Sequence, residues 1–358
     1  MPKILVCFIS NNPSNLELSL SAHSQNFTAE TRMLIVDTKA THAANEPLAK
    51  QHNAIHVAEE EFKENTPDEF KPLFQGAYGG NRNICLYQAF KQGANAVFFD
   101  DDTTPAENPL AQYEALFSEG KKIIAGKYLR HAAGTPQLIK YAIDAVVDYA
   151  DGELESEQAK QKLEGFFAGV PPETEIPLKG VGVAGGNLGV SLYCLEKYCF
   201  FPTNYRVEDG TYGVLAKSFT GEEPYNSEDN PAVFHNKTPR ENALLENLAN
   251  EIKGNIIALC VKDSVEEKDS GFKHLAYNIE ENSGLVFKAF NLDHLEFKQR
   301  QKNILEKASA LGFEKQFSAL LEIAKATPRP SEEEVKAKAQ LFHYAQDNWP
   351  KALKERSA

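Results

Sequence analysis

The chain has 358 residues, of which 42% are hydrophobic, and it carries a formal net charge of −13 at pH 7. A chain of this length and composition can bury the core of one large domain or of two ordinary ones. The negative charge, with no dense block of Lys and Arg, excludes nucleic acid and anionic membrane surfaces as expected partners.

The apolar segments and the cysteines indicate where such a protein works. The apolar stretches are too short for a signal-peptide core or an integral membrane segment. The five cysteines are odd in number and show no CxxC spacing. This pattern disfavours a zinc site made of cysteines and indicates buried thiols in a reducing, cytoplasmic setting.

Short runs rich in Val, Ile and Phe recur through the first part of the chain. They predict strands at residues 4–9, 33–37, 96–100 and 122–128. Helical spacing between them predicts helices over residues 15–25 and 81–93. Strands that alternate with helices predict an α/β fold with crossover units and a mostly parallel sheet. Ligands of such sheets bind at the carboxyl ends of the strands, where Asp37 and Asp100 lie.

The second half of the chain is mainly helical in pattern. Thr238, Pro239 and Glu241 combine an N-cap, a first-turn proline and a capping-box partner, which predicts a helix start there. Ser331 and Glu334 repeat the capping box before a later helix. We therefore expect a catalytic domain over residues 1–240 and a mainly helical region over 241–358. That region would serve as a lid, a packing layer or a contact in a homo-oligomer.

Three successive carboxylates follow the strand predicted at 96–100. Like charges this close raise one another's pKa unless a cation lies between them. Asp100 and Asp102 bracket one residue, so on an extended turn their side chains point to one side and that of Asp101 to the other. Two carboxylates on one side suit Mg²⁺ or Mn²⁺. Taken alone, the triplet is also typical of a solvated acidic turn.

The stretch GGNRNICLYQAFKQGANAVFFDDDTTP resembles the nucleotide-sugar-dependent glycosyltransferases of the GT-A fold, those of the family 2 type. Arg82 and Asn83 match the Arg-Asn pair of that family, and Asp100 and Asp102 match its DxD motif. The resemblance covers roughly residues 3–240. It implies a Rossmann-like GT-A fold with a mixed, mostly parallel central sheet. It also implies that a divalent metal, Mg²⁺ or Mn²⁺, is held against the donor diphosphate.

The resemblance also assigns residues to the nucleotide sugar. The segment ILVCFISNNPSN is similar to the first strand and polar turn of the family, which places Ser10 and Asn11 at the donor. Asp37 matches an acidic residue that contacts the base or ribose. Arg82, Asn83, Asp100 and Asp101 complete the predicted donor contacts on this side.

Two later motifs match the acceptor side of the family. Gly185 and Gly186 lie where small residues let the backbone approach the sugar, although a tight turn that needs positive φ is an equal explanation. Asp209 matches the general base of inverting members, and Glu208 lies beside it. Acidic residues at a helix N-terminus, favoured by the helix dipole, are the other interpretation of this pair.

The motif HNKTPR supplies the last candidates. His235 matches a third metal ligand of several GT-A families, whereas a lone histidine near a strand is otherwise a hydrogen-bonded structural residue. Lys237 and Arg240 would offer positive charge to phosphate oxygens of the donor or of a charged acceptor, or form a solvated basic turn. This motif also resembles retaining enzymes that glycosylate glycerate or phosphoglycerate, so the stereochemical outcome stays open. In a retaining mechanism Glu208 and Asp209 would position the acceptor.

These observations predict a hexosyltransferase that moves a sugar from a nucleotide-diphosphate donor to the hydroxyl of a small molecule or glycan. A sugar nucleotidyltransferase is the first alternative, but the Gly-rich loop expected after its first strand is replaced here by SNNPSNLE. A non-catalytic metal-binding or sugar-binding protein is the second alternative. It would apply if the acidic triplet were only a solvent-facing loop.

Overall fold

A computed structural model describes residues 3–130, 134–170, 183–227, 229–236, 238–266, 274–292, 298–326 and 328–355. The chain divides into two compact units. The first consists of Met1–Leu129, Lys179–Asn236 and Ala337–Ala358, and the second of Arg130–Leu178 and Lys237–Lys336. Residues 130–178, expected within the catalytic domain, thus group with the helical unit. The end of the chain, expected in the helical region, joins the first unit.

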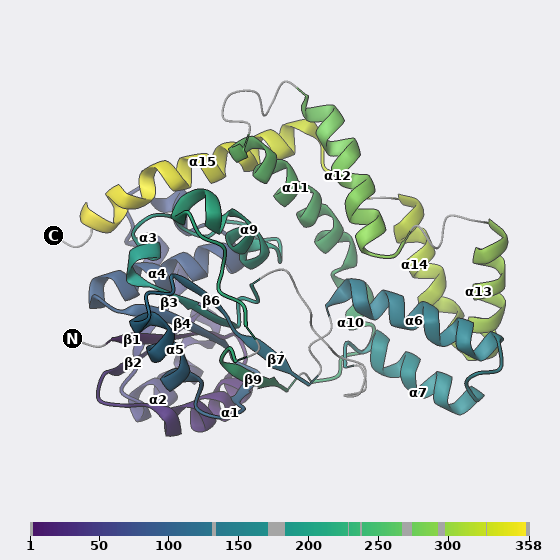
Figure 1. Cartoon of the computed structure of the whole chain (residues 1–358), viewed down its shortest axis with the longest axis horizontal. Coiled ribbons are helices and arrows are strands. Elements are labelled where there is room, and N and C mark those ends of the chain that lie inside the picture. The colour runs from purple at the N-terminus through teal and green to yellow at the C-terminus, as the bar shows by residue number, and fades with distance from the viewer. Residues whose placement is uncertain are drawn as a thin grey trace. The chain divides into compact units, whose positions relative to one another are not determined.

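The first unit is built on a six-stranded sheet (Figure 1). Its strand order is β3-β2-β1-β4-β8-β6, in which β1 pairs in parallel with β2 and β4, and β2 pairs in parallel with β3. Strand β8 pairs antiparallel with β4 and β6. The strands span Ile4–Ile9 (β1), Thr31–Asp37 (β2), Ile55–Ala58 (β3), Asn95–Asp100 (β4), Ile123–Ala125 (β6) and Asn187–Val190 (β8). The expected α/β fold with a mixed, mostly parallel sheet is confirmed.

Helices pack on both faces of this sheet because alternate strand residues point to opposite faces. One hydrophobic cluster joins Val6 and Phe8 to apolar side chains of α1 (Pro13–His23), α2 (Lys39–Gln51) and α5 (Pro109–Ser118). The opposite cluster joins Leu5 and Cys7 to side chains of α3 (Glu59–Glu64), α4 (Asn81–Gln92), α8 (Leu192–Leu195), α9 (Glu208–Thr220) and α15 (Glu332–Glu355). All five cysteines are buried as free thiols, as expected.

A small second sheet branches from the first. Its order is β5-β9-β7, with β5 at Thr103–Pro105, β7 at Lys127–Leu129 and β9 at Ala232–His235. The single strand predicted at 122–128 is therefore two strands in two sheets, divided at Gly126. A Cβ at Gly126 would lie 2.3 Å from the Asn187 side chain, so the branch point needs glycine.

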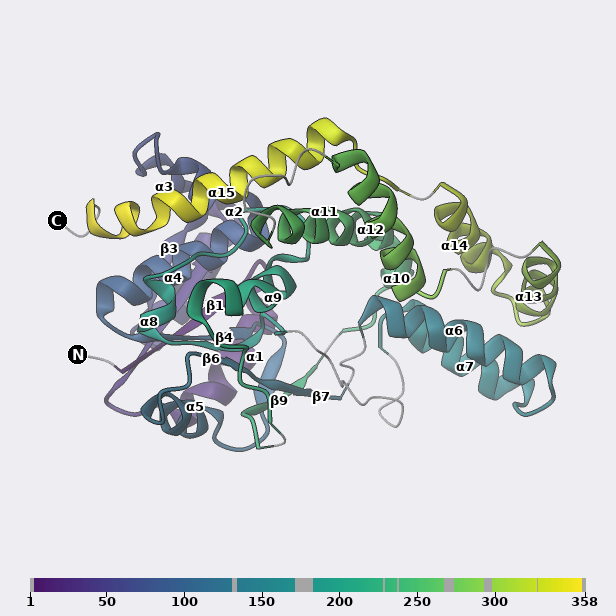
Figure 2. The same ribbon diagram turned by 45° about the horizontal axis from the view of Figure 1, so that its top comes forward.

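The second unit is helical in its described residues (Figure 2). Helices α6 and α7 lie side by side, and α10 to α14 complete the unit together with the first residues of α15. Their bounds are Thr135–Ala150 (α6), Ser156–Phe167 (α7), Ala243–Glu246 (α10), Leu248–Glu266 (α11), Leu275–Ala289 (α12), Lys298–Ala310 (α13) and Glu314–Ala326 (α14). A search of the described residues finds no helix whose length and apolar character would let it cross a membrane.

One predicted helix start is wrong and the other is confirmed. Helix α10 begins at Ala243, not next to Thr238, because Asn242 adopts a left-handed φ of 54° and the Arg240 backbone N–H donates to the Ala168 carbonyl. At the later position, Ser331 Oγ accepts a hydrogen bond from the Glu334 backbone N–H, 3.2 Å away, and α15 begins at Glu332.

The C-terminal half of α15 closes the hydrophobic core of the first unit. Trp349 is fully buried against Phe74, and its indole N–H donates to the Leu195 carbonyl at 2.6 Å. Gln346 exchanges two hydrogen bonds with the backbone of Cys199. The last helix from Ala337 onward is therefore an integral part of the sheet unit.

Replacing the single tryptophan tests this packing. Trp349→Ala leaves a large cavity and an unpaired carbonyl, so we expect the free energy of unfolding to fall by about 3–5 kcal/mol. Urea unfolding followed by circular dichroism measures this, since the variant has no tryptophan fluorescence. Lys354→Ala, an exposed site on the same helix, is the control. Equal stability of the two variants would show that α15 does not belong to this core.

Candidate functional site

The acidic triplet lies at the carboxyl end of β4, on the turn that leads into β5. Pairing of β5 with β9 places Thr103 opposite His235 and so brings the histidine to the same turn. The ligand atoms of Asp100, Asp102 and His235 all lie within 4.8 Å of one another. His235 Nε2 is 3.2 Å from Asp102 Oδ2. The three residues predicted to hold a metal are thus brought together.

Buried polar side chains from α1 hold this turn in shape. The Thr103 hydroxyl donates to the Asp100 carbonyl at 2.7 Å, and the Ser19 hydroxyl donates to the Thr103 carbonyl at 2.8 Å. His23 Nε2 lies 3.3 Å from the Thr103 hydroxyl. Burial lowers the pKa of His23 to about 3, so this imidazole is neutral at physiological pH.

The Asp101 side chain has a partner of its own. Its Oδ2 accepts a short hydrogen bond from the hydroxyl of Ser10, which is buried at the end of β1. Burial raises the pKa of Asp101 to about 6; the Ser10 hydrogen bond opposes this rise, and the neighbouring carboxylates of Asp102 and Asp100 add to it. Asn11, the next residue of the turn after β1, is exposed.

Sequence reasoning missed Tyr128, which contacts two of the three clustered residues. Its hydroxyl donates to Asp100 Oδ2 at 2.9 Å, and its ring centroid lies 4.9 Å from that of His235. Burial raises the pKa of Tyr128 well above its ordinary value, and the charge of Asp100 adds to this rise, so the hydroxyl stays a donor. Only the parallel pairing of β7 with β9 brings this tyrosine to the site, and no local motif signals it.

Arg82, at the start of α4, is a buried cation among carboxylates. Its Nε donates to Glu208 Oε1 at 2.9 Å and its Nη1 donates to the Gly185 carbonyl at 2.7 Å. Burial alone would lower the pKa of Arg82, but the charges of Glu208, Asp100 and Asp209 outweigh burial and raise it. The guanidinium is therefore a fixed positive charge between the acidic turn and α9.

Glu208 and Asp209 form the first turn of α9. Burial raises the pKa of Glu208 to about 7; Asp209 adds to the rise and Arg82 opposes it. Glu208 Oε2 is buried and has no hydrogen-bond partner among the described residues. Asp209 accepts hydrogen bonds from the backbone N–H groups of Gly185 and Gly210, at 2.8 and 2.7 Å.

The glycine pair permits close approach to these side chains. A Cβ at Gly186 would lie 1.9 Å from the Asp100 carboxylate, and a Cβ at Gly185 would lie 2.2 Å from the Arg82 guanidinium. The pair forms a turn in which the Asn187 N–H donates to the Ala184 carbonyl at 3.1 Å, but neither glycine has a positive φ, so the backbone conformation of the turn does not itself require glycine. The small residues are needed because the backbone passes directly beside Asp100 and Arg82.

The side chains of Asn83 and Asp37 form hydrogen bonds within the protein. The Asn83 side chain is fully buried, donates to the carbonyls of Leu73 and Phe200, and accepts from the Phe200 N–H. Asp37, at the end of β2, is 1% exposed and accepts hydrogen bonds from His42, Asn45 and His56. Contact of either residue with a nucleotide stays a prediction.

Of the two basic candidates, the structure describes Arg240. Arg240 belongs to the second unit, is exposed, and forms a 3.6 Å ion pair with Glu246. Lys237 lies outside the described residues. Their predicted contacts with phosphate are not tested by the geometry.

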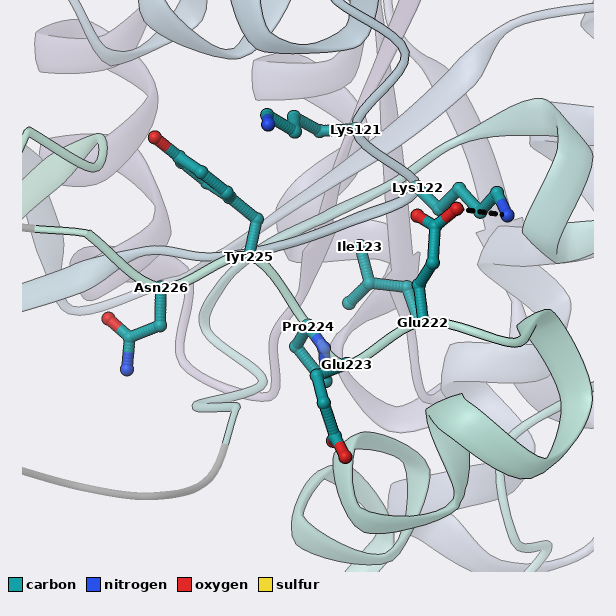
Figure 3. A pocket seen from close by; sticks show the side chains of 8 residues that line it. All are labelled: Lys121, Lys122, Ile123, Glu222, Glu223, Pro224, Tyr225 and Asn226. Carbon is teal, nitrogen blue, oxygen red and sulfur yellow. Dashed lines mark hydrogen bonds and ion pairs between the residues drawn. The ribbon is translucent and has the colours of Figure 1, made fainter.

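A surface hollow of about 390 Å³ in the first unit is lined by Lys121, Lys122, Glu222 and Tyr225 among others. Figure 3 shows these side chains from close by. Lys122 and Glu222 form a 2.7 Å ion pair across the hollow. Lys122 precedes β6, whose register with β8 places this hollow toward the amino end of β4. It is therefore at the opposite end of the strands from Asp100 and is not part of the acidic cluster.

The donor set fits a hard divalent cation. Two carboxylates and one imidazole converge, and such mixed oxygen and nitrogen sets bind Mn²⁺ or Mg²⁺ with water and phosphate oxygens completing the shell. Glycine at position 186 leaves the Asp100 carboxylate the space that a Cβ would fill.

The sequence matches no protein-family model and no curated protein. Among solved structures, the fold is similar to glucosyl-3-phosphoglycerate synthase from Mycobacterium tuberculosis. In its complex with phosphoglyceric acid the identity is 17%, the TM-score is 0.44, and the match covers 72% of this chain and 79% of that chain. Its complex with Mn²⁺, UDP and glucosyl-3-phosphoglycerate matches at 16% identity and a TM-score of 0.42, over 72% and 78% of the two chains. Mouse xyloside xylosyltransferase 1 matches at 15% identity and a TM-score of 0.31, over 54% and 68%.

Proposed function

We propose that this protein is a metal-dependent glycosyltransferase that moves a sugar from a nucleotide-diphosphate donor to a hydroxyl acceptor. The observation that carries the proposal is the convergence of Asp100, Asp102 and His235 at the carboxyl end of β4. In sheets of this kind, ligands bind at that end of the strands. The DxD motif of the GT-A families matches these same two aspartates.

The chemistry of a nucleotide-sugar donor explains why such a set is useful. As the glycosidic bond breaks, negative charge grows on the diphosphate leaving group. A Mg²⁺ or Mn²⁺ ion held by Asp100, Asp102 and His235 would neutralise that charge, and it would stabilise the transition state more than the ground state. Tyr128 would orient Asp100 for this role through its 2.9 Å hydrogen bond.

The remaining residues divide between donor and acceptor. Ser10, Asn11, Asp37, Arg82, Asn83 and Asp101 are the proposed nucleotide side. Gly185, Gly186, Glu208 and Asp209 are the proposed sugar and acceptor side, where Arg82 fixes Glu208 and the Gly185 carbonyl. Asp209 is the proposed general base in an inverting reaction, or an acceptor-orienting group in a retaining one.

Lys237 and Arg240 are proposed phosphate contacts of the donor or of a charged acceptor.

A ligand-binding measurement tests the donor site. We expect one of UDP-, GDP-, ADP- or dTDP-sugars to raise the melting temperature by several degrees in the presence of Mn²⁺, because a ligand stabilises the state that binds it. The rise should vanish with chelator and in Asp102→Ala. Asp68→Ala, whose side chain is 93% exposed, should behave as wild type. The absence of a rise with every donor at millimolar concentration would contradict the proposal.

Steady-state kinetics with the donor so identified tests Asp209. If Asp209 takes the proton of the acceptor hydroxyl, Asp209→Asn lowers kcat by about 10²-fold or more. The donor-induced melting shift should persist, since the metal ligands are unchanged. Asp229→Asn, an exposed aspartate, is the control. A kcat within a factor of two of wild type would remove Asp209 as the base.

The pH dependence of stability tests the buried Glu208. Its folded-state pKa of about 7 lies above its ordinary value of 4.5, so the folded state binds the extra proton. Its contribution to stability is complete below about pH 4.5 and is lost as the pH rises through about 7. We expect the free energy of unfolding to fall less steeply over this window in Glu208→Gln than in wild type, measured by urea unfolding at each pH. Parallel curves would contradict the raised pKa.

A further inference from the structure

A second group of metal-ligating side chains lies at the end of β2, outside the acidic turn. Asp37 Oδ1 is 2.8 Å from His42 Nδ1, and Asp37 Oδ2 is 2.8 Å from His56 Nε2. The ligand atoms of all three residues lie within 4.8 Å of one another. The two imidazole rings stack, with centroids 3.8 Å apart and planes 20° apart. Both rings therefore aim a nitrogen at one carboxylate.

We propose that Asp37, His42 and His56 bind a transition-metal ion such as Zn²⁺. Two imidazoles and one carboxylate form a donor set typical of Zn²⁺, which prefers nitrogen ligands at about 2.0–2.1 Å. One ligand atom from each residue lies within 4.8 Å of the others, and donors around a tetrahedral ion with such bonds are about 3.3 Å apart, so small side-chain rotations would bring the three onto one ion. Three protein ligands leave a position for water.

The charge at Asp37 supports a cation at this place. The Asp37 side chain is 0% exposed, and its ion pairs in the described chain are those with the two histidines, which are charged only when protonated. A buried carboxylate without a permanent cation is costly. A divalent ion would supply this charge at neutral pH, and each ligating imidazole would keep its proton on the nitrogen that faces away from the carboxylate.

Asn45 supports the cluster from the next turn of α2. Its Nδ2 donates to Asp37 Oδ2 at 2.9 Å, which is the kind of contact that orients a ligating carboxylate. The Asn45 side chain is fully buried, and its Oδ1 has no hydrogen-bond partner among the described residues. An amide rotated by half a turn would present this oxygen to the ion as a further ligand in place of the hydrogen bond to Asp37.

An ion can reach this cluster from solvent. A surface hollow of about 400 Å³ is lined by His42, Glu46, Lys50, Asn53 and His56. The His42 side chain is 31% exposed and that of His56 is 10% exposed. The site would tie together β2, β3 and α2, which supply its three ligands. It shares no ligand with the Asp100, Asp102 and His235 group, and it is an alternative to the proposed contact of Asp37 with the nucleotide.

Calorimetric titration of the full chain with Zn²⁺ at pH 7.5 tests the assignment. The Asp100→Asn/Asp102→Asn variant serves as background, because it removes the other carboxylate ligands. We expect one Zn²⁺ per chain in this background, and at least 100-fold weaker binding once His42→Gln or His56→Gln is added. His274→Gln, an exposed histidine elsewhere, should leave binding unchanged.

Two results would overturn the assignment. One is the absence of Zn²⁺ binding in both the wild type and the background variant. The other is Zn²⁺ binding that survives His42→Gln and His56→Gln without loss of affinity. His42 is partly exposed, so its substitution is tolerated best, and melting curves recorded without metal show whether each variant is folded. A Co²⁺ titration gives an independent readout, since the visible bands of Co²⁺ bound to two imidazoles should disappear in the same variants.

Discussion

The acidic turn after β4 must hold three neighbouring carboxylates against their mutual repulsion, and much of the first unit is arranged around this requirement. Each carboxylate faces a different partner: Asp100 faces Tyr128, Asp101 faces Ser10, and Asp102 faces His235. These partners come from three separate strands or strand ends. The turn therefore keeps its shape only if both sheets are formed, which couples the geometry of the site to the fold.

Arg82 offsets the negative charge of Asp100 in the acidic turn and of Glu208 and Asp209 in α9. Its buried guanidinium lies between the acidic turn and the first turn of that helix, where it bonds Glu208 and the Gly185 carbonyl. Removing Arg82 would leave Glu208, Asp100 and Asp209 without this cation, which costs more than losing an exposed ion pair. Asp209 directly follows Glu208 in the first turn of α9. The ion pair between Arg82 and Glu208 therefore also helps to hold the proposed base in position. The proposed donor and acceptor sides thus share one cation.

What the sequence could predict was local in nature. The DxD spacing, the strand before it and the strand ends at Asp37 and Asp100 follow from periodicity over a few residues, and the structure has them where expected. Tyr128 could not be found, because it reaches Asp100 only through the pairing of β7 with β9. The break at Gly126 was missed for a similar reason, since it depends on the side chain of Asn187. The extent of the two units also depends on packing between distant segments, as the burial of Trp349 shows.

The ends of β4 and β2 differ in chemistry, and the difference argues for different cations. At β4 two carboxylates and one imidazole face a turn where substrate oxygens can complete the shell, a set suited to Mg²⁺ or Mn²⁺. At β2 one carboxylate and two imidazoles form a set richer in nitrogen, which favours Zn²⁺ or a similar ion. Parallel strands place their carboxyl ends at one edge of a sheet, and the Ser10 N–H bonded to the Val36 carbonyl joins β1 to β2 there. A metal at Asp37 would hold β2 and β3 in place without competing for the ligands that the donor diphosphate needs.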